Sequence, residues 1–256
     1  MIGIFDSGFG GLSVLKEIVS LLPGEKYLYY ADSAHCPYGE KTREYVIDRA
    51  LAISRLLMER GAEIIVVACN TATAAAIRTL RATWPDFPFV GMEPAVKPAA
   101  LHTQSGVIGI LATAGTLKGS NYLDLREKYS DKVKVTEHVG QGFVELVEKG
   151  ILDGPEAEST VRASVSPLLD AGADTIVLGC THYPFLEPVI RRVAGPDVEI
   201  INPAPAVARQ TERLLPKRQE TGNPASTIPT SSHPGITVLS SGASIPDETI
   251  ARFLGL

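Results

Sequence analysis

Two of the three cysteines in this chain occupy the same position in two similar segments. Residues 61–71 read GAEIIVVACNT and residues 172–182 read GADTIVLGCTH, which align without a gap at an offset of 111 residues. In each segment a short β-branched run precedes the cysteine, Cys69 or Cys180, a pattern typical of a buried strand ending in a thiol. Two matched thiols can face opposite sides of one small substrate, so that one removes a proton and the other delivers one. This arrangement favours inversion of a carbon centre.

Two further residues could exchange protons with these thiols: a carboxylic acid at the end of another strand-like run, and an imidazole just after the second cysteine. Asp6 ends the first strand-like run, in the turn DSGFGG, and His182 follows Cys180 by two residues. Either side chain can accept or return a proton for a thiol, whereas the structural alternatives are a helix N-cap and a backbone-bonded polar residue. We also expect a helix after each cysteine, whose N-terminus would lower the pKa of the thiol and favour the thiolate.

Small polar residues beside the same strand ends are candidates for binding an anion. The glycine-rich turn after Asp6 presents Ser7 and backbone N–H groups suited to a carboxylate, but it lacks the lysine of a P-loop and is not GxGxxG, which disfavours a nucleotide. Further candidates come from the strand ends and from the loop after the second strand-like run: Pro37, Tyr38, Gly39, Asn70, Thr71, Thr113, Thr116, Thr181 and His182. The alternative for the Pro37–Gly39 segment is ordinary turn chemistry.

The elements that must position these residues alternate along the chain. Strand-like runs lie at 2–5, 26–32, 63–69, 87–92, 106–113, 132–138, 174–180, 198–201 and 236–241, and helix-like stretches at 10–22, 41–60, 71–83, 117–129, 155–171 and 204–215. Apolar strands alternating with helices indicate parallel sheets covered on both faces, with ligands beyond the carboxyl ends of the strands. Cys69 and Cys180 are predicted to lie there.

A second repeat extends the first. IGIFDSG at 2–8 aligns with IGILATA at 108–114 at an offset of 106 residues, although chance similarity between buried strands is the alternative. We therefore predict an α/β fold of two pseudo-symmetric lobes, each a mostly parallel sheet covered by helices, with the active site in the interlobe cleft. The first lobe is expected to comprise residues 1–95 and 207–256, and the second residues 96–206. The Pro/Ser/Thr/Gly-rich segment 218–235 is interpreted as a mobile surface loop.

Composition excludes several classes of protein. The 256 residues carry a net charge of −5 and are 45% hydrophobic, typical of a globular protein and unfavourable for a nucleic-acid binder. We find no apolar run long enough to span a bilayer and no leader pattern before the first strand, so a cytoplasmic location is expected. Three cysteines do not form a disulfide framework, and the absence of CxxC or HxxxH spacing predicts no metal site.

Several longer motifs resemble those of the glutamate racemases. They are IGIFDSGFGGLSVL (2–15), PYGEKT (37–42), VVACNTATA (67–75), GTLKGSNY (115–122), FVELVEKG (143–150) and LGCTHYPFL (178–186). The resemblance implies that Cys69 and Cys180 are the acid/base thiols, supported by Asp6, His182 and Glu148. It also implies substrate contacts at Asp6, Ser7, Tyr38, Gly39, Asn70, Thr71, Thr181 and His182. Many members carry Cys-Pro before the FVELVE segment, where this chain has Gly140-Gln141-Gly142.

The resemblance further implies interconversion of L- and D-glutamate without pyridoxal phosphate or another cofactor, supplying D-glutamate for peptidoglycan. The expected partner is the small substrate, with no nucleic acid or membrane, and a homodimer is expected. Aspartate racemase is the nearest alternative. A thiol hydrolase built on Cys180 and His182 leaves Cys69 without a role, and an amino-acid binding protein needs neither thiol. Cys36 and His35 are interpreted as bystanders beside the 37–42 motif.

Overall fold

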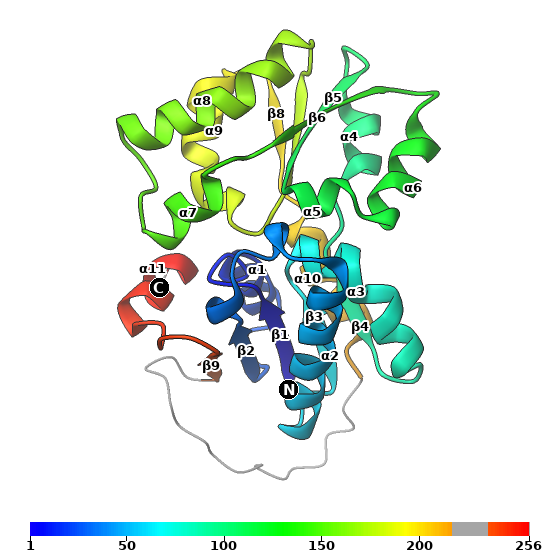
Figure 1. Ribbon diagram of the computed structural model, residues 1–256, viewed down its shortest axis with the longest axis vertical. Coiled ribbons are helices and arrows are strands. Elements are labelled where there is room, and N and C mark those ends of the chain that lie inside the picture. The colour runs from blue at the N-terminus through cyan, green and yellow to red at the C-terminus, as the bar shows by residue number, and fades with distance from the viewer. Residues whose placement is uncertain (217–234, 256) are drawn as a thin grey trace.

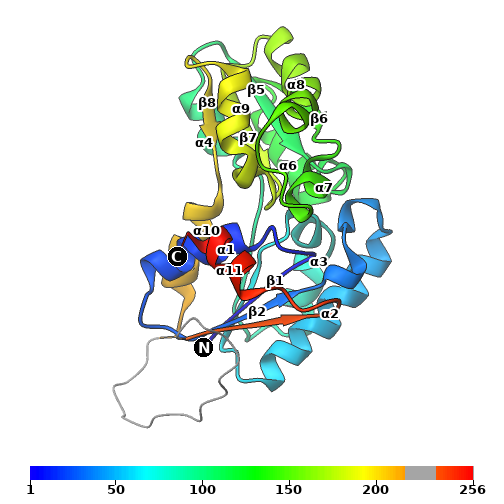
Figure 2. The ribbon, with the colours of Figure 1, turned by 90° about the vertical axis from the view of Figure 1, so that its left-hand side faces the viewer.

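The computed structural model, which describes residues 1–216 and 235–255, contains two parallel β-sheets. In the first, the strand order is β4-β3-β1-β2-β9, with β1 Ile2–Asp6, β2 Tyr27–Ala31, β3 Ile64–Val67, β4 Phe89–Gly91 and β9 Ile236–Ser240. In the second it is β6-β5-β7-β8, with β5 Val107–Ala112, β6 Lys134–Val139, β7 Thr175–Gly179 and β8 Glu199–Ile201. The sheets form two stacked lobes (Figures 1 and 2), and the predicted α/β fold class is confirmed.

The two sheets repeat one another in register as well as in strand order. Ile4 of β1 pairs with Val66 of β3, and Ile110 of β5 pairs with Val177 of β7. The equivalent residues are separated by the same offsets, 106 and 111, as the two sequence repeats. Because the register is shared, Cys69 after β3 and Cys180 after β7 lie at equivalent corners of their sheets. Chance similarity between buried strands does not account for this correspondence.

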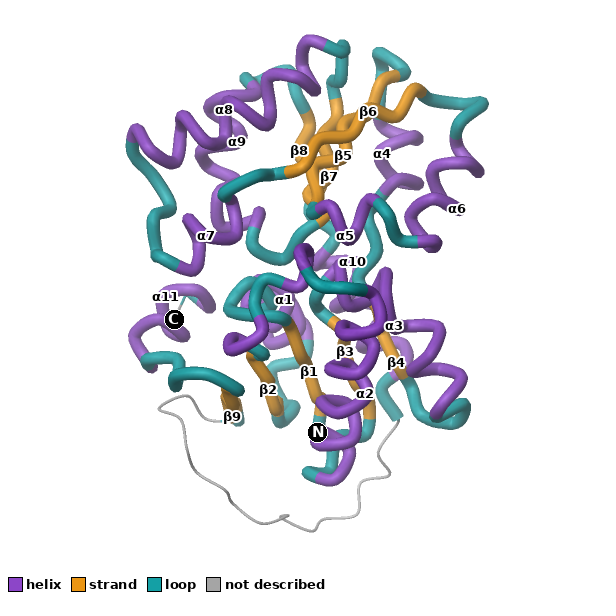
Figure 3. The backbone as a smooth tube through the Cα atoms, viewed as in Figure 1, coloured by secondary structure: helices purple, strands orange, loops and turns teal. Residues whose placement is uncertain are grey.

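Helices cover both faces of each sheet, as Figure 3 shows. On the first sheet, alternate residues of β3 explain the layers: Ile64 and Val66 belong to the core shared with α1, and Ile65 and Val67 to the core shared with α2 and α3. The helices of this lobe are α1 Leu12–Leu21, α2 Arg43–Glu59, α3 Asn70–Thr83, α10 Ala204–Leu214 and α11 Asp247–Leu254. Two short 3-10 turns, η1 Ser33–His35 and η2 Tyr38–Glu40, connect β2 to α2.

The second sheet is enclosed in the same way. Its helices are α4 Val96–His102, α5 Ala114–Leu117, α6 Ser120–Tyr129, α7 Phe143–Glu148, α8 Pro155–Asp170 and α9 Glu187–Ala194, with the 3-10 turn η3 Tyr183–Leu186 after β7. The predicted helix-like stretches omitted several short helices, among them α4 and α9, which contain Pro98 and Pro188. Both prolines lie in the first turn of their helix, where a missing N–H costs no hydrogen bond.

The division into lobes at residues 95 and 206 remains a prediction. The boundary at residue 206 falls inside α10, which packs against α1 of the first lobe. Nearly all of the segment 218–235 lies outside the described residues. Among the described helices, none combines the length and apolar character required to cross a membrane.

Candidate active site

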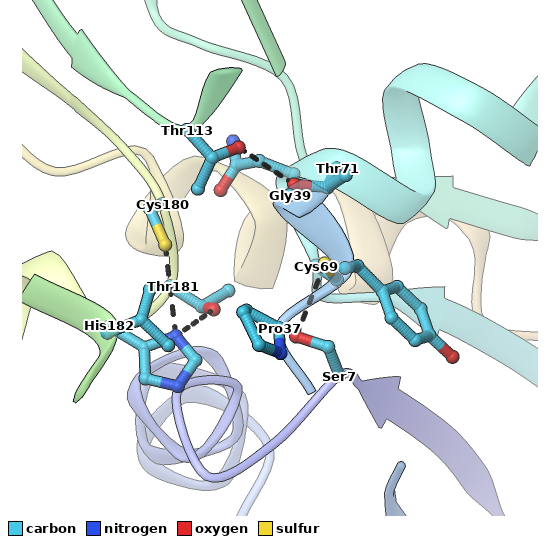
Figure 4. Close-up of a pocket in the computed structure, with 12 residues that line it drawn as sticks. Ser7, Pro37, Gly39, Cys69, Thr71, Thr113, Cys180, Thr181 and His182 are labelled. Atoms are coloured by element: carbon cyan, nitrogen blue, oxygen red, sulfur yellow. Dashed lines mark hydrogen bonds between the residues drawn. The ribbon is translucent and has the colours of Figure 1, made fainter. Parts of the chain in front are cut away.

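One pocket between the lobes collects the carboxyl ends of the repeated strands. It is lined by Ser7, Pro37, Tyr38, Gly39, Cys69, Asn70, Thr71, Thr113, Val144, Cys180, Thr181 and His182. Cys69 and Cys180 approach it from opposite sides in Figure 4 and are both buried. Every one of these residues except Val144 was a candidate from the sequence. Val144 was missed because an apolar residue at the start of a helix carries no chemical signal.

Cys69 follows β3 and forms the N-cap of α3. Its sulfur accepts a hydrogen bond from the N–H of Ala72 at 3.4 Å, and its thiol donates to the hydroxyl of Ser7 at 3.8 Å. Burial, reinforced by the nearby charge of Asp6, raises the pKa of the Cys69 thiol, and the bond from Ala72 offsets only part of this. The expectation of a lowered pKa was therefore wrong in its net direction: the helix N-terminus lowers the pKa of the Cys69 thiol through Ala72, but desolvation of the sulfur raises it by more.

Cys180 lies in a chain of three side chains. Its sulfur is 3.8 Å from Nδ1 of His182, and Nε2 of His182 is 2.6 Å from Oε1 of Glu148. Burial alone would lower the pKa of His182, but hydrogen bonds with Cys180 and Glu148 raise it well above its usual value. The structure thus brings Cys180, His182 and Glu148 together, with a protonated imidazole favoured beside the sulfur.

Asp6 connects the lobes. The hydroxyl of Thr181 donates to its Oδ1 at 3.1 Å, and the N–H of Gly8 donates to its Oδ2 at 3.0 Å. Burial raises the pKa of the Asp6 carboxyl, although His182 counteracts this. Asp6 does not cap α1, whose N-cap is Gly11 with no side-chain hydrogen bond. Its carboxylate lies within electrostatic reach of Cys69, although no hydrogen bond joins them in the described residues.

Three threonine hydroxyl groups form a row at another part of the pocket wall. Oγ1 of Thr71 is 2.8 Å from Oγ1 of Thr113, which is 3.0 Å from Oγ1 of Thr116. Thr116 is fully buried behind the other two and does not line the pocket. Beside this row, the buried Oδ1 of Asn70 has no hydrogen-bond partner among the described residues. An unpaired acceptor at a pocket wall is suited to an N–H donor of a ligand.

The loop carrying Tyr38 and Gly39 is fixed from behind by a buried ion pair. Arg49 of α2 donates from Nε and a terminal nitrogen to Asp32 at 2.9 and 2.7 Å, and the Tyr38 hydroxyl donates to the same carboxylate. Burial alone would raise the pKa of Asp32, but the bonds from Arg49 and Tyr38 hold it below its usual value. Sequence analysis missed Asp32 and Arg49, because nothing in their spacing marks a pair 17 residues apart.

Glycines of the turn after β1 make room for the catalytic candidates. A Cβ atom on Gly10 would lie 2.3 Å from Nδ1 of His182, and one on Gly8 would lie 2.3 Å from Oε1 of Glu148. Near Glu148, Gly142 has a φ of 80° and forms the N-cap of α7, a backbone conformation that favours glycine. The Gly140-Gln141-Gly142 segment therefore still delivers Glu148 to His182.

Cys36, interpreted from the sequence as a bystander, lies close to two of the catalytic candidates. Its sulfur would lie 3.2 Å from a Cβ atom on Gly8, and ligand atoms of Cys36, Glu148 and His182 all lie within 4.8 Å of one another. His35, by contrast, contacts the exposed Tyr45. The approach of Cys36 depends on the path of the loop after β2, which the sequence does not specify.

These features define a class of enzyme: two buried thiols at equivalent strand ends of a duplicated α/β fold face one small pocket. The family model of Asp/Glu/Hydantoin racemases matches residues 2–211, and the chain belongs to that family. It is accordingly an isomerase of the racemase class, as expected from the sequence.

Individual relatives agree with the family assignment. The chain is 54% identical over 214 residues to a glutamate racemase of Methylococcus capsulatus, which covers 84% of this chain and 79% of the relative. Its fold resembles glutamate racemase isoform RacE1 of Bacillus anthracis, with a TM-score of 0.83, 31% identity and coverage of 100% and 94%. It also resembles Escherichia coli glutamate racemase in complex with L-glutamate and the activator UDP-MurNAc-ala, with a TM-score of 0.83, 33% identity and coverage of 99% and 93%. The resemblance inferred from the sequence motifs is confirmed.

Proposed function

We propose that this chain is a glutamate racemase that interconverts L- and D-glutamate with two cysteines and no cofactor. The observation that carries the proposal is the position of Cys69 and Cys180 at equivalent strand ends on opposite sides of one pocket. A planar carbanion formed between two thiols can be reprotonated from either face, which inverts the centre.

The proton balance is simple. A thiolate on one side takes the α-proton of glutamate, the C–H electron pair passes into the α-carboxylate as it becomes enediolate-like, and the opposite thiol returns a proton to the α-carbon. Hydrogen bonds to Cys180 and Glu148 favour a protonated His182, whereas burial beside Asp6 favours the neutral thiol at Cys69. We propose this as the resting state. His182 and Glu148 then support Cys180, and Asp6 supports Cys69 through its charge.

The pocket lining suits a zwitterionic substrate with a second carboxylate. None of its described residues is lysine or arginine, so apart from His182 the donors available to carboxylates are neutral. Ser7 and the backbone of its turn supply donors on one side, and the hydroxyls of Thr71 and Thr113 on the other. The unpaired Oδ1 of Asn70 is an acceptor for the α-ammonium group. As negative charge grows on the α-carboxylate, these donors stabilise the transition state.

Glutamate rather than aspartate is proposed because the relatives named glutamate racemase cover most of this chain and one was solved with L-glutamate. By the same resemblance, we propose a cytoplasmic homodimer that supplies D-glutamate for peptidoglycan. Size-exclusion chromatography with light scattering tests the dimer.

The decisive experiment is deuterium exchange without added cofactor. In deuterated buffer, α-deuterium should enter both enantiomers of glutamate, and aspartate should react at least about 10-fold more slowly. A requirement for pyridoxal phosphate, or a preference for aspartate, would contradict the proposal.

Single substitutions test the two thiols. Cys69→Ser and Cys180→Ser should each lose racemisation in both directions by at least about 100-fold, since each removes one acid/base group. Cys36→Ser is the matched control and should retain activity. Full activity in either of the first two variants would eliminate the two-thiol mechanism.

A further inference from the structure

Three side chains of metal-binding type meet at the edge of the pocket from separate parts of the chain. Cys36 lies between η1 and η2 of the first lobe, Glu148 ends α7, and His182 follows β7 of the second lobe. Their ligand atoms lie within 4.8 Å of one another. Because the three residues are far apart in sequence, no spacing motif revealed them.

The local packing holds this cluster together and leaves it accessible. Gly8 faces both Cys36 and Glu148, and any side chain there would collide with the Glu148 carboxylate. His182 is 1% exposed, whereas the side chain of Glu148 is 23% exposed and Cys36 is half-buried. One side of the cluster is thus buried and the other is open to an ion from solvent.

A thiolate, an imidazole and a carboxylate are a ligand set that suits Zn²⁺. We propose that Cys36, Glu148 and His182 bind Zn²⁺, with a solvent water as fourth ligand, and that the bound ion inhibits the enzyme. Zinc–sulfur bonds of about 2.3 Å and zinc–nitrogen bonds of about 2.0 Å require the Cys36 sulfur to approach and the Glu148 carboxylate, whose Oε1 is 2.6 Å from Nε2 of His182, to shift as the ion replaces their hydrogen bond. The part-exposed Glu148 and the loop of Cys36 provide that adjustment. On binding, the Cys36 thiol and the protonated His182 each release one proton to solvent, so that they coordinate as thiolate and neutral imidazole.

The location of the site explains the inhibition. A coordinated His182 can no longer exchange a proton with Cys180, 3.8 Å away. The ion also joins a first-lobe loop to the second lobe beside the pocket, which opposes any separation of the lobes to admit substrate. The inhibitory half of the inference rests on the proposed function, whereas binding of the ion does not.

Binding is tested without substrate by titrating the full-length protein with Co²⁺ as a spectroscopic substitute for Zn²⁺. A thiolate-to-cobalt charge-transfer band in the near ultraviolet is expected for the unmodified protein and for Cys69→Ser, and Zn²⁺ should displace it. Cys36→Ser should lose the band. Persistence of the band in Cys36→Ser, or its absence from the unmodified protein, would overturn the site. Cys36→Ala serves as a second variant, with circular dichroism to verify folding of each.

Inhibition is tested by racemisation of glutamate in the presence of Zn²⁺, with Mg²⁺ as the control ion. Cys36→Ser should match the unmodified protein without metal and should raise the Zn²⁺ concentration for half-inhibition by at least about 10-fold, the usual effect of losing a supporting group at a metal site. An unchanged half-inhibition concentration would show that Zn²⁺ acts on Cys69 or Cys180 instead. If neither variant nor unmodified protein racemises glutamate, the proposed function fails while the cobalt titration still decides the site.

Discussion

Nε2 of His182 and Oε1 of Glu148 lie 2.6 Å apart, although the two residues are separated by 34 positions and belong to different elements. The carboxylate also accepts a hydrogen bond from the N–H of Phe9 in the first lobe, at 2.9 Å. Glu148 therefore orients the imidazole beside Cys180 and connects it to the turn after β1. This carboxylate is the natural point at which to test the Cys180 side of the mechanism.

Glu148→Gln keeps the shape of the side chain and removes its charge. We expect kcat to fall about 10- to 100-fold in both directions with KM changed less than about 3-fold, because the loss concerns proton transfer rather than substrate binding. Steady-state kinetics with each enantiomer measure this. Glu145→Gln, on the exposed face of the same helix, is the control and should leave both constants unchanged. An unaltered kcat in Glu148→Gln would remove Glu148 from the mechanism.

The raised pKa of His182 predicts a pH dependence of stability. Its pKa in the folded chain exceeds the value near 6.5 of the unfolded chain, so the folded state binds the proton more tightly. This stabilisation is complete below about pH 6.5 and is lost as the pH rises through the folded pKa. The difference in free energy of unfolding between the unmodified protein and His182→Asn should therefore shrink with rising pH in denaturant titrations. A difference that grows over that range would contradict the assigned protonation.

Much of the fold could be predicted because periodicity and repetition are local signals. The β-branched runs around Ile64 and Ile176 specified buried parallel strands, and the carboxyl-end rule for such sheets placed Cys69 and Cys180 near a ligand. The repeat offsets carried enough information to anticipate two related sheets. The short helix α4 was missed because the sequence does not show whether Pro98 lies in the first turn of a helix, where proline is tolerated, or interrupts one.

The site was harder to predict where it depends on packing between the lobes. The bond from Thr181 to Asp6 joins residues 175 positions apart, and no pattern in either segment indicates it. The pKa of Cys69 was predicted in the wrong direction because a helix N-terminus is visible in sequence, whereas the depth of burial is not. The position of Cys36 beside Glu148 and His182 could not be predicted either, because it depends on the path of the loop after β2.

The contact between Gly10 and His182 gives a steric test. In Gly10→Ala the new methyl group would lie 2.3 Å from Nδ1 of His182 and 2.6 Å from Oγ1 of Thr181. We expect the free energy of unfolding to decrease by about 1–3 kcal/mol, the usual cost of overpacking, and kcat to fall at least about 10-fold as the imidazole is displaced. Gly24→Ala, with no atom within 4 Å of the new methyl group, should change stability by less than about 0.5 kcal/mol. Equal behaviour of the two variants would refute the steric argument.

The ion pair of Asp32 and Arg49 gives the last prediction, on substrate binding. Arg49→Met leaves the fully buried Asp32 carboxylate without its cation and loosens the loop that presents Tyr38 and Gly39 to the pocket. Removing one partner of a buried ion pair lowers the free energy of unfolding by up to about 3–5 kcal/mol. Because Arg49 is 25% exposed, we expect a decrease of about 2–3 kcal/mol in Arg49→Met. We also expect KM for glutamate to rise.

The stability lost in Arg49→Met should depend on pH in a definite direction. The pKa of Asp32 is lowered in the folded chain, so its stabilisation is present above the unfolded value near 3.9 and is lost as the pH falls through the folded value. The gap in free energy of unfolding between the unmodified protein and Arg49→Met should therefore be full at pH 7 and should narrow in acid. Arg55→Met, exposed on the same helix, is the control and should alter neither stability nor KM. A gap independent of pH would mean that Arg49 acts through packing of its alkyl chain rather than through its charge.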